Sequence, residues 1–275
     1  MHRVDGGLRD DAGTLHAPAG DAARIVSLVP SITELVCELG LASQLAGRTG
    51  FCVHPREVVR AVPKVGGTKD PDLEAIRAIA PTHVILNVDE NRRDTAEALA
   101  RFVPHLVVTH PMAPGDNLRL YALLGGIFGR TEQAADMAAA YTQASQRLSG
   151  GALGWPRERV LYLIWRAPWM TVSRDTYLSR TLALAGWDTV PAAADARYPE
   201  VTLDASLAAG VDRVLLSSEP YRFRERHVAE VGELLGRLRT PPPVTLINGE
   251  MTSWYGSRAI RGLDYLRELR AGLCT

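Results

Sequence analysis

Two glycines, a threonine and a lysine precede a predicted helix in the stretch VGGTKDPDLEAIRAIAPTHVIL, residues 65–86. Such a turn could bind phosphate, because glycine-rich loops present backbone N–H groups to anions. A phosphate loop needs the spacing G-x-x-x-x-G-K-[ST], and neither that spacing nor G-x-G-x-x-G occurs in the chain. We therefore expect Gly66 and Gly67 to let the backbone turn sharply at the carboxyl end of a sheet, where open α/β folds bind ligands.

A cysteine and a histidine lie close together in a second loop, TGFCVHP, residues 49–55. The chain has three cysteines, Cys37, Cys52 and Cys274, which form no CxxC pair, so neither a disulfide framework nor a zinc ribbon is expected. Cys52 is the one that we keep as a candidate site residue. His54 is either an ordinary surface histidine or a ligand contact. No catalytic set such as G-x-S-x-G or H-E-x-x-H accompanies them.

Aromatic residues gather in predicted loops of the second half of the chain. All five tryptophans lie in that half. Aromatic rings with a few charged groups nearby suit a large, flat, partly polar ligand. Glu250, Arg166 and Arg258 are the charged residues close to these rings in the sequence. The aromatic residues in question are Trp165, Trp169, Tyr198, Tyr221, Trp254 and Tyr255.

The bulk composition excludes several classes of protein. The 275 residues include 31 Lys and Arg and 31 Asp and Glu, and this neutral balance argues against nucleic acid as a partner. No apolar run approaches the ~18 residues that would predict a membrane span. Residues 1–23 are rich in Gly, Ala, Asp and Pro and lack an apolar signal-peptide core, so we expect a flexible tail.

Short apolar runs alternate with helical stretches from residue 24 onward. This alternation predicts an α/β fold with mostly parallel sheets covered on both faces. It occupies residues 24–129 and 151–275, and one long Ala- and Gln-rich helix over residues 130–150 separates the two parts. We therefore expect two α/β lobes joined by a helix.

The first unit of this pattern has clear local signals. RIVSLVP, residues 24–30, predicts a buried strand. SITELVCELG, residues 31–40, predicts a helix with Ser31 as its N-cap, Glu34 as the capping-box partner and Gly40 at its end.

Two segments, one in each part, have similar sequences. LEAIRAIAPTHVIL, residues 73–86, aligns without gaps with LDASLAAGVDRVLL, residues 203–216. The alignment places Glu74 opposite Asp204 in the first helical turn of each unit. Such acids either complement the helix dipole or serve a shared function.

These segments resemble a known family, the cobalamin- and siderophore-type substrate-binding proteins of ABC importers (helical-backbone metal receptors, class III periplasmic binding proteins). The matching stretches are RIVSLVPSITELVCELG, KVGGTKDPDLEAIRAIAPTHVIL, RYPEVTLDASLAAGVDRVLL and NGEMTSWYGSR. The cobalamin-binding branch is the most similar. The resemblance implies two Rossmann-like lobes joined by a single long backbone helix, with a ligand cleft between the lobes.

The resemblance also implies roles for individual residues. Glu74 and Asp204 fall where the family docks onto arginines of the importer's membrane subunits, although a glutamate is more usual at the second position. His54 would contact the ligand and could coordinate a corrinoid cobalt. The full candidate ligand-binding set is Cys52, His54, Thr68, Lys69, Asn87, Trp165, Trp169, Tyr198, Tyr221, Glu250, Trp254, Tyr255 and Arg258.

The resulting hypothesis is a non-enzymatic binding protein that delivers a corrinoid (cobalamin or cobinamide) or similar metal chelate to an ABC importer. The chelate is the bound ligand, and no intrinsic cofactor is expected. A siderophore or haem binder is an alternative, and it would need basic groups such as Lys69, Arg92, Arg93, Arg166 and Arg258. Two further alternatives are an enzyme that uses Cys52 or His54 in the same cleft and a paralogue that binds a protein partner.

The compartment and assembly are expectations from the family. Its members work outside the cytoplasmic membrane, yet no export signal or lipid anchor is visible in the sequence. The protein is therefore either periplasmic or a cytoplasmic corrinoid-handling protein. We expect a monomer with no membrane span and no nucleic-acid partner.

Overall fold

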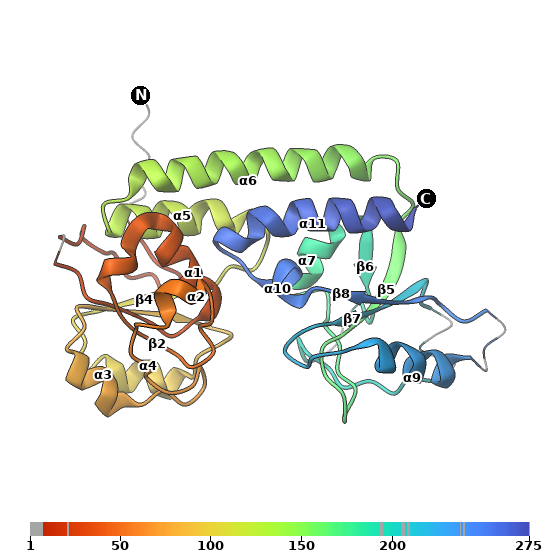
Figure 1. Ribbon diagram of the computed structural model, residues 1–275, viewed down its shortest axis with the longest axis horizontal. Helices are drawn as coiled ribbons and strands as arrows, with labels where there is room; N and C mark the ends of the chain where they lie inside the picture. The colour runs from red at the N-terminus through yellow and green to blue at the C-terminus, as the bar shows by residue number, and fades with distance from the viewer. Residues whose placement is uncertain are drawn as a thin grey trace. The chain divides into compact units, whose positions relative to one another are not determined.

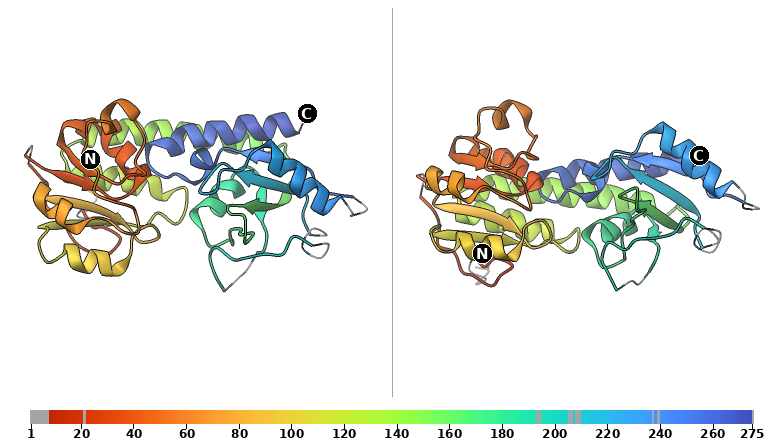
Figure 2. Two further views of the ribbon diagram at one scale, coloured as in Figure 1. Left: turned by 60° about the horizontal axis from the view of Figure 1, so that its bottom comes forward. Right: turned by 90° about the horizontal axis from the view of Figure 1, so that it is seen from below.

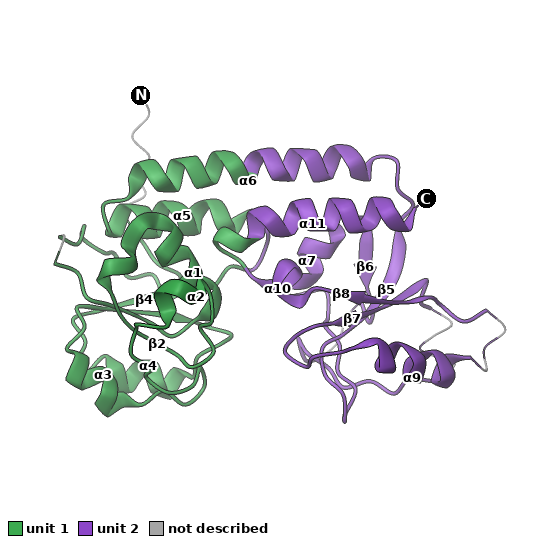
Figure 3. Ribbon diagram, in the orientation of Figure 1, with its two compact units in different colours: residues 1–111, 115–141, 255–258 green, residues 112–114, 142–254, 259–275 purple. Residues whose placement is uncertain are grey.

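The computed structural model describes residues 8–20, 22–192, 195–204, 207, 210–236, 238 and 240–274. The chain divides into two compact units (Figure 3). Unit 1 comprises residues 1–111, 115–141 and 255–258, and unit 2 comprises residues 112–114, 142–254 and 259–275. The division falls inside the long helix α6, Thr131–Ala152, and again near the start of the last helix, α11, Ser257–Leu273.

Unit 1 is built on a parallel four-stranded sheet of order β2-β1-β3-β4. Helices cover both faces of the sheet, with α3 and α4 on one side and α5 on the other (Figure 1). Val26, Val84 and Leu86 of the strands pack against Ile76 and Leu99 of α3 and α4. The elements are β1 (Ile25–Ser27), α1 (Pro30–Val36), η1 (Cys37–Leu41), η2 (Ala42–Gln44), β2 (Leu45–Arg48), α2 (Arg56–Val59), α3 (Leu73–Ile79), β3 (His83–Asn87), α4 (Arg93–Leu99), β4 (His105–Thr109) and α5 (Asp116–Ile127).

Unit 2 repeats this topology with a parallel sheet of order β6-β5-β7-β8. Helix α9 packs its Val231 and Leu235 against Leu161 and Leu216, while α7 lies on the opposite face (Figures 1 and 2). The expected fold class, with two α/β lobes and parallel sheets, is confirmed. The elements are β5 (Glu158–Leu163), α7 (Tyr177–Ala183), β6 (Trp187–Thr189), β7 (Arg213–Ser217), α9 (Glu225–Leu235), β8 (Val244–Ile247), α10 (Gly249–Ser253) and α11.

The amino-terminal segment is more ordered than its composition predicts. Residues 8–20 belong to unit 1 and make hydrogen bonds to it, whereas a flexible tail was predicted for residues 1–23. The buried Asp10 accepts hydrogen bonds from the N–H groups of Val108 (2.9 Å) and Thr14 (2.8 Å) and contacts the Nε2 of His16 at 3.1 Å. Because a buried carboxylate needs such partners, Asp10 helps to fix the segment on β4, together with the hydrogen bond from the Asp11 N–H to the Val108 carbonyl at 2.9 Å.

Helix α1 begins differently from the expectation. Its N-cap is Val29, which has no side-chain cap, and Pro30 occupies the first helical turn. Proline suits that position because its missing N–H would have no helical partner there. The predicted capping box of Ser31 and Glu34 is therefore wrong, and Glu34 makes a buried ion pair with Arg258.

The turn at Gly66 confirms the interpretation of the glycine pair. Gly66 has φ +88°, and a Cβ there would lie 2.7 Å from the backbone nitrogen of Asp72. Gly66 also accepts a hydrogen bond from the N–H of Gly50 just beyond β2. Asp72 then caps α3 by accepting from the N–H of Ala75 at 3.0 Å, so the glycine positions the start of that helix.

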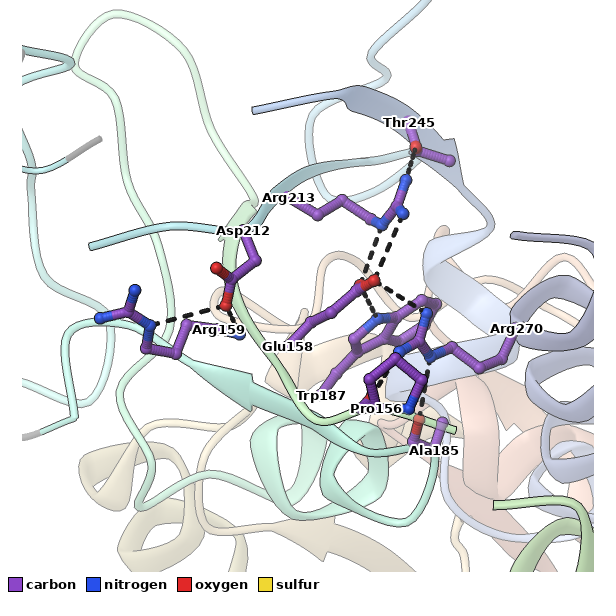
Figure 4. Close-up of polar contacts among 9 residues, drawn as sticks. All are labelled: Pro156, Glu158, Arg159, Ala185, Trp187, Asp212, Arg213, Thr245 and Arg270. Atoms are coloured by element: carbon purple, nitrogen blue, oxygen red, sulfur yellow. Dashed lines mark hydrogen bonds and ion pairs between the residues drawn. The ribbon is translucent and has the colours of Figure 1, made fainter. Parts of the chain in front are cut away.

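A buried ionic network holds the amino-terminal edge of the sheet in unit 2 (Figure 4). Glu158, the first residue of β5, accepts from Arg213 at 3.1 Å, from Arg270 of α11 at 3.1 Å and from the indole N–H of Trp187 at 2.9 Å. Burial alone would raise the pKa of Glu158, but the hydrogen bonds from Arg213 and Trp187 outweigh it, so the pKa is lowered. The Arg270 guanidinium also donates to the carbonyls of Pro156 and Ala185.

None of the helices within the described residues combines the length and the apolar character that crossing a membrane requires.

Candidate functional site

The carboxyl ends of the strands carry apolar side chains that water can reach. Nine large hydrophobic side chains are exposed among the described residues, and five of them lie in loops that follow strands. In unit 1 these are Phe51 (66% exposed), Val53 (49%) and Val88 (50%), and in unit 2 they are Trp165 (40%) and Tyr198 (43%). Exposed apolar groups at the edge where α/β folds bind ligands indicate a binding surface on each unit.

The loop after β2 alternates exposed and buried residues. Phe51 and Val53 face solvent, while Cys52 between them is fully buried. The Cys52 Sγ lies 3.0 Å from the Thr33 hydroxyl and 3.1 Å from that of Thr49. Burial raises the pKa of the Cys52 thiol, so this residue anchors the loop and does not reach the surface that we expected it to line.

His54 follows directly and is half-buried, and a cis peptide bond joins it to Pro55. Its place in the loop puts it next to the exposed Val53. Within the described residues, no group of three His, Cys, Asp or Glu side chains has the geometry to hold a metal ion. Any metal contact by His54 would therefore be one ligand to a metal that a bound chelate supplies.

The polar candidates of unit 1 organise the loop between β3 and α4. The buried side chain of Asn87 accepts through Oδ1 from the N–H groups of Asp89 (2.8 Å) and Glu90 (3.3 Å). The Lys69 ammonium donates to the Asp89 carbonyl at 2.7 Å, and the Thr68 carbonyl, on a half-buried residue, accepts from the Asn91 amide at 2.9 Å. An Asx-type turn of this kind presents the intervening Val88 to solvent.

The aromatic candidates of unit 2 form one contacting group. Trp169 stacks on Phe223 with a centroid distance of 6.1 Å and an interplanar angle of 7°. Tyr221 contacts Trp165 edge-on at 5.7 Å and Phe223 at 4.8 Å. The Arg166 guanidinium lies over the Trp169 ring at 5.8 Å. These rings follow the ends of β5 and β7, so neighbouring strands bring them together.

Tyr198 joins this group through the backbone. The N–H of Val201 donates to the Trp169 carbonyl at 2.9 Å, and the N–H of Thr171 donates to the Pro199 carbonyl at 3.0 Å. Two such bonds hold the segment around Tyr198 beside the Trp169 loop. The exposed ring of Tyr198 lies 6.0 Å from the Arg197 guanidinium.

The last four candidates are divided between the two units. Glu250 is half-buried in the first turn of α10, and Trp254 donates its indole N–H to Glu219 at 2.6 Å, both in unit 2. Tyr255 and Arg258 belong to unit 1. There the Tyr255 hydroxyl donates to Glu90 Oε1 at 2.5 Å, and Arg258 is buried against Glu34. Both side chains thus serve internal contacts of unit 1.

Glu74 and Asp204, the two acidic residues paired in the internal alignment, occupy different positions in their units. Glu74 is exposed in the first turn of α3 and contacts the Arg77 guanidinium at 2.5 Å. Asp204, also exposed, accepts through Oδ1 from the N–H of Leu207 at 2.9 Å. The same contact over three residues is made by Asp72 in unit 1. Asp204 therefore matches Asp72 in its capping role, although the sequence alignment sets it opposite Glu74.

Each basic candidate for an anionic ligand already has a partner. Lys69 donates to a carbonyl, Arg166 pairs with Glu230 at 2.5 Å and Arg258 pairs with Glu34 at 2.7 Å. Likewise Arg92 pairs with Asp94 at 2.7 Å and Arg93 with Glu97 at 3.0 Å. These contacts leave the arginines less suited to an incoming anion than their positions in the sequence indicate.

Sequence reasoning missed the exposed Phe51, Val53 and Val88 and the buried stacking partner Phe223. The signal was present for the first two, because they flank Cys52 within the loop that was singled out. Which of them faces outward depends on the local turn, in which the N–H of Cys52 donates to the Thr49 carbonyl at 3.2 Å.

Comparison with known proteins gives a consistent family match. The family described as periplasmic binding protein matches residues 25–232. A vitamin B12-binding protein of Pectobacterium carotovorum is 23% identical over 239 residues, which are 86% of this chain and 84% of the relative.

Two solved structures illustrate the shared fold. The periplasmic vitamin B12 binding protein BtuF of Vibrio cholerae matches with a TM-score of 0.78 and 16% identity, over 92% of this chain and 99% of that one. The periplasmic heme-binding protein RhuT from Roseiflexus sp. RS-1 matches with a TM-score of 0.78 and 21% identity, over 92% and 100%. At these identities the likeness concerns the fold.

Proposed function

The chain belongs to the periplasmic binding protein family, and from this premise we propose that it is a non-enzymatic receptor for a metal chelate, with a corrinoid as the first choice. The observation that carries the proposal is the set of exposed apolar and aromatic side chains at the carboxyl ends of both sheets. A corrin or porphyrin offers a large flat surface, and burying such apolar surface contributes roughly 25 cal/mol per Å². A vitamin B12-binding relative supports the corrinoid choice.

In this proposal the rings of Trp165, Trp169 and Tyr198 in unit 2 offer a contact surface for a macrocycle, and Phe51 and Val53 offer such a surface in unit 1. His54 either coordinates the metal of the chelate or donates a hydrogen bond to a peripheral amide. The buried Cys52 takes no part, which removes one of the two residues on which an enzymatic alternative would depend.

We propose that the protein works outside the cytoplasmic membrane and delivers its ligand to an ABC importer in that membrane. Glu74 and Asp204 are both exposed and carry the charge needed to meet arginines of a membrane subunit. The Glu74→Gln/Asp204→Asn double variant is expected to bind ligand normally but to lose stimulation of importer ATPase activity in proteoliposomes. Unchanged stimulation would remove the docking role.

A titration of the purified protein with cyanocobalamin and cobinamide tests the ligand class. Calorimetry is expected to give one-to-one binding, and tryptophan fluorescence is expected to be quenched as the chelate covers Trp165 and Trp169. A change in the visible corrinoid spectrum that disappears in His54→Ala would assign cobalt coordination to that residue. Binding of neither corrinoid would contradict the first choice.

Haem is the second candidate ligand, and it should be titrated in parallel. The match to a heme-binding structure over nearly the whole chain supports it. Haem carries two carboxylates, whereas cobinamide carries none. Binding of haem should therefore depend on basic residues in the site, and binding of cobinamide should not. If none of the three compounds bound, the receptor proposal itself would fail.

A further inference from the structure

The segment after β7 presents two arginines to an open hollow in unit 2. In the segment from Tyr221 to Arg224, Phe223 is buried in the aromatic group, and Arg222 and Arg224 on either side of it are exposed. The hollow has a volume of about 630 Å³, and both arginines line it together with Ser218 and Asn248. The two arginines, which flank the buried Phe223, therefore both border this one hollow.

The charge of these two arginines is not neutralised locally as that of the other candidates is. Within the part of unit 2 that the structure describes, no ion pair is formed by Arg222 or Arg224. Glu225 also lines the hollow, which leaves an excess of one positive charge among the lining residues. By contrast, the nearby Arg166 pairs with Glu230, and Arg226 donates to the His227 ring at 3.3 Å.

The apolar part of the lining explains why these charges matter. Leu216, Leu246 and Ile247 of β7 and β8 border the same hollow, so part of its wall is apolar. A charge-assisted hydrogen bond is stronger beside such a wall than in open water, because the local dielectric is lower. A guanidinium group can bind carboxylate or phosphate oxygens through two parallel hydrogen bonds (bidentate binding). A lysine ammonium group does not have this geometry.

We infer that this hollow is a subsite for an anionic group, a carboxylate or a phosphate, held by Arg222 and Arg224. The inference deepens the proposed function and rests on it in one respect, namely that the group belongs to the metal chelate. It favours a chelate with carboxylate or phosphate arms over one without them. None of the five basic residues that the sequence singled out takes part.

Free anions test the subsite without a chelate. Citrate and pyrophosphate are titrated by calorimetry, at about 0.1 M salt, into the wild type and the Arg222→Gln/Arg224→Gln variant. We expect one-to-one binding to the wild type that is about tenfold weaker or more in the variant, since two charge-assisted contacts are lost. Preference for citrate or for pyrophosphate identifies the carboxylate or the phosphate as the natural group.

Arg226→Gln is the matched control, because it removes the same charge two residues further on without touching the hollow. It should weaken anion binding less than about threefold, since a surface charge at that distance is screened. An equal loss in the control, or no anion binding by the wild type, would overturn the subsite. Binding of cyanocobalamin, cobinamide or haem is measured on the same samples, so the receptor proposal can stand or fall independently.

Haem and its dimethyl ester then link the subsite to the chelate. The ester lacks both carboxylates but keeps the macrocycle, so a wild-type preference for haem of about tenfold is expected to vanish in the double variant. Equal discrimination in the wild type and the variant would detach the subsite from the chelate.

Discussion

Arg258 donates to both carboxylate oxygens of Glu34, at 2.7 and 2.8 Å, across 224 positions of sequence. Both side chains are almost fully buried, with 8% and 3% of their surfaces exposed. The pair therefore fixes the segment of residues 255–258 on helix α1 within unit 1. Nearby, the Tyr121 hydroxyl donates to the Gly256 carbonyl at 2.8 Å and strengthens the same attachment.

Removing one charge of this pair is expected to destabilise unit 1 strongly. Glu34→Gln leaves the Arg258 guanidinium buried without a counter-charge, which costs about 3–5 kcal/mol in comparable sites. Urea unfolding followed by far-UV circular dichroism measures the loss. Glu74→Gln is the matched control, because its pair with Arg77 is exposed and should change the free energy of unfolding little. Similar losses in the two variants would contradict the structural role of Arg258.

A second contact of this segment should make stability depend on pH. Burial raises the pKa of Glu90 to about 7, although the hydrogen bond from Tyr255 works in the opposite direction. The folded protein therefore binds more protons than the unfolded chain between the ordinary glutamate pKa and about 7. The contribution of Glu90 to the free energy of unfolding should fall as pH rises through that window, by up to about 3 kcal/mol, and level off above it. Burial lowers the pKa of His83 to about 4, and that group contributes in the opposite direction, so the Glu90 contribution is obtained as the difference between the wild type and Glu90→Gln.

Two variants test this assignment. Glu90→Gln should remove the falling contribution, so the stability difference between wild type and variant should itself depend on pH. Tyr255→Phe removes the hydrogen bond that lowers the pKa, so the Glu90 midpoint should move to higher pH. Urea midpoints between pH 5 and pH 8 measure the first effect, and carbon NMR of labelled glutamate measures the second. A slope that persists in Glu90→Gln would assign it to another group.

Much of this architecture could be predicted from the sequence. The alternation of apolar runs with helical stretches predicted two α/β lobes with parallel sheets, and both this fold and the family resemblance are confirmed. Strands β2 and β6 are harder to predict, because they have only four and three residues and lie at sheet edges. Their LAGR and WDT sequences lack an apolar run because Gly47, Arg48 and Asp188 interrupt it, so local pattern alone does not distinguish them from loops.

The candidate site could be predicted only in outline. The loops were located correctly, since the ends of parallel strands fix where loops emerge. Which side chain in a loop faces outward depends on tertiary partners, and here Cys52, Asn87 and Arg258 turn toward Thr33, Asp89 and Glu34. The capping error at Ser31 has the same origin, because Pro30 starts the helix and Arg258 takes up Glu34.

The buried network of unit 2 gives a matching prediction at low pH. Glu158→Gln leaves Arg213 and Arg270 without their shared counter-charge, and a loss of about 3–5 kcal/mol is expected. Because the folded pKa of Glu158 is lowered, its contribution is present above the unfolded value and is lost as pH falls through the folded value. Urea unfolding between pH 3 and pH 7 should show a smaller acid loss in Glu158→Gln than in the wild type, because other carboxylates with lowered pKa, such as Asp264, still titrate. Asp188→Asn, which breaks the exposed pair with Arg157, is the control.

The exposed side chains in the loops at the carboxyl ends of the unit 1 strands, which we call the rim of unit 1, should contribute more to binding than to stability. Phe51 is 66% exposed, so Phe51→Ser removes little buried surface from the folded protein and should leave the unfolding midpoint nearly unchanged. If a chelate covers that ring, the loss of apolar contact is worth about 1.5–3 kcal/mol, or roughly a ten- to hundredfold rise in Kd. Leu153→Ser is the control, because Leu153 is 91% exposed and lies just beyond the end of α6, not in a loop that follows a strand. Calorimetry with cyanocobalamin and haem compares the two variants. A rise in Kd confined to Phe51→Ser places the ligand on this rim, whereas equal affinities would separate the exposed apolar surface of unit 1 from ligand binding.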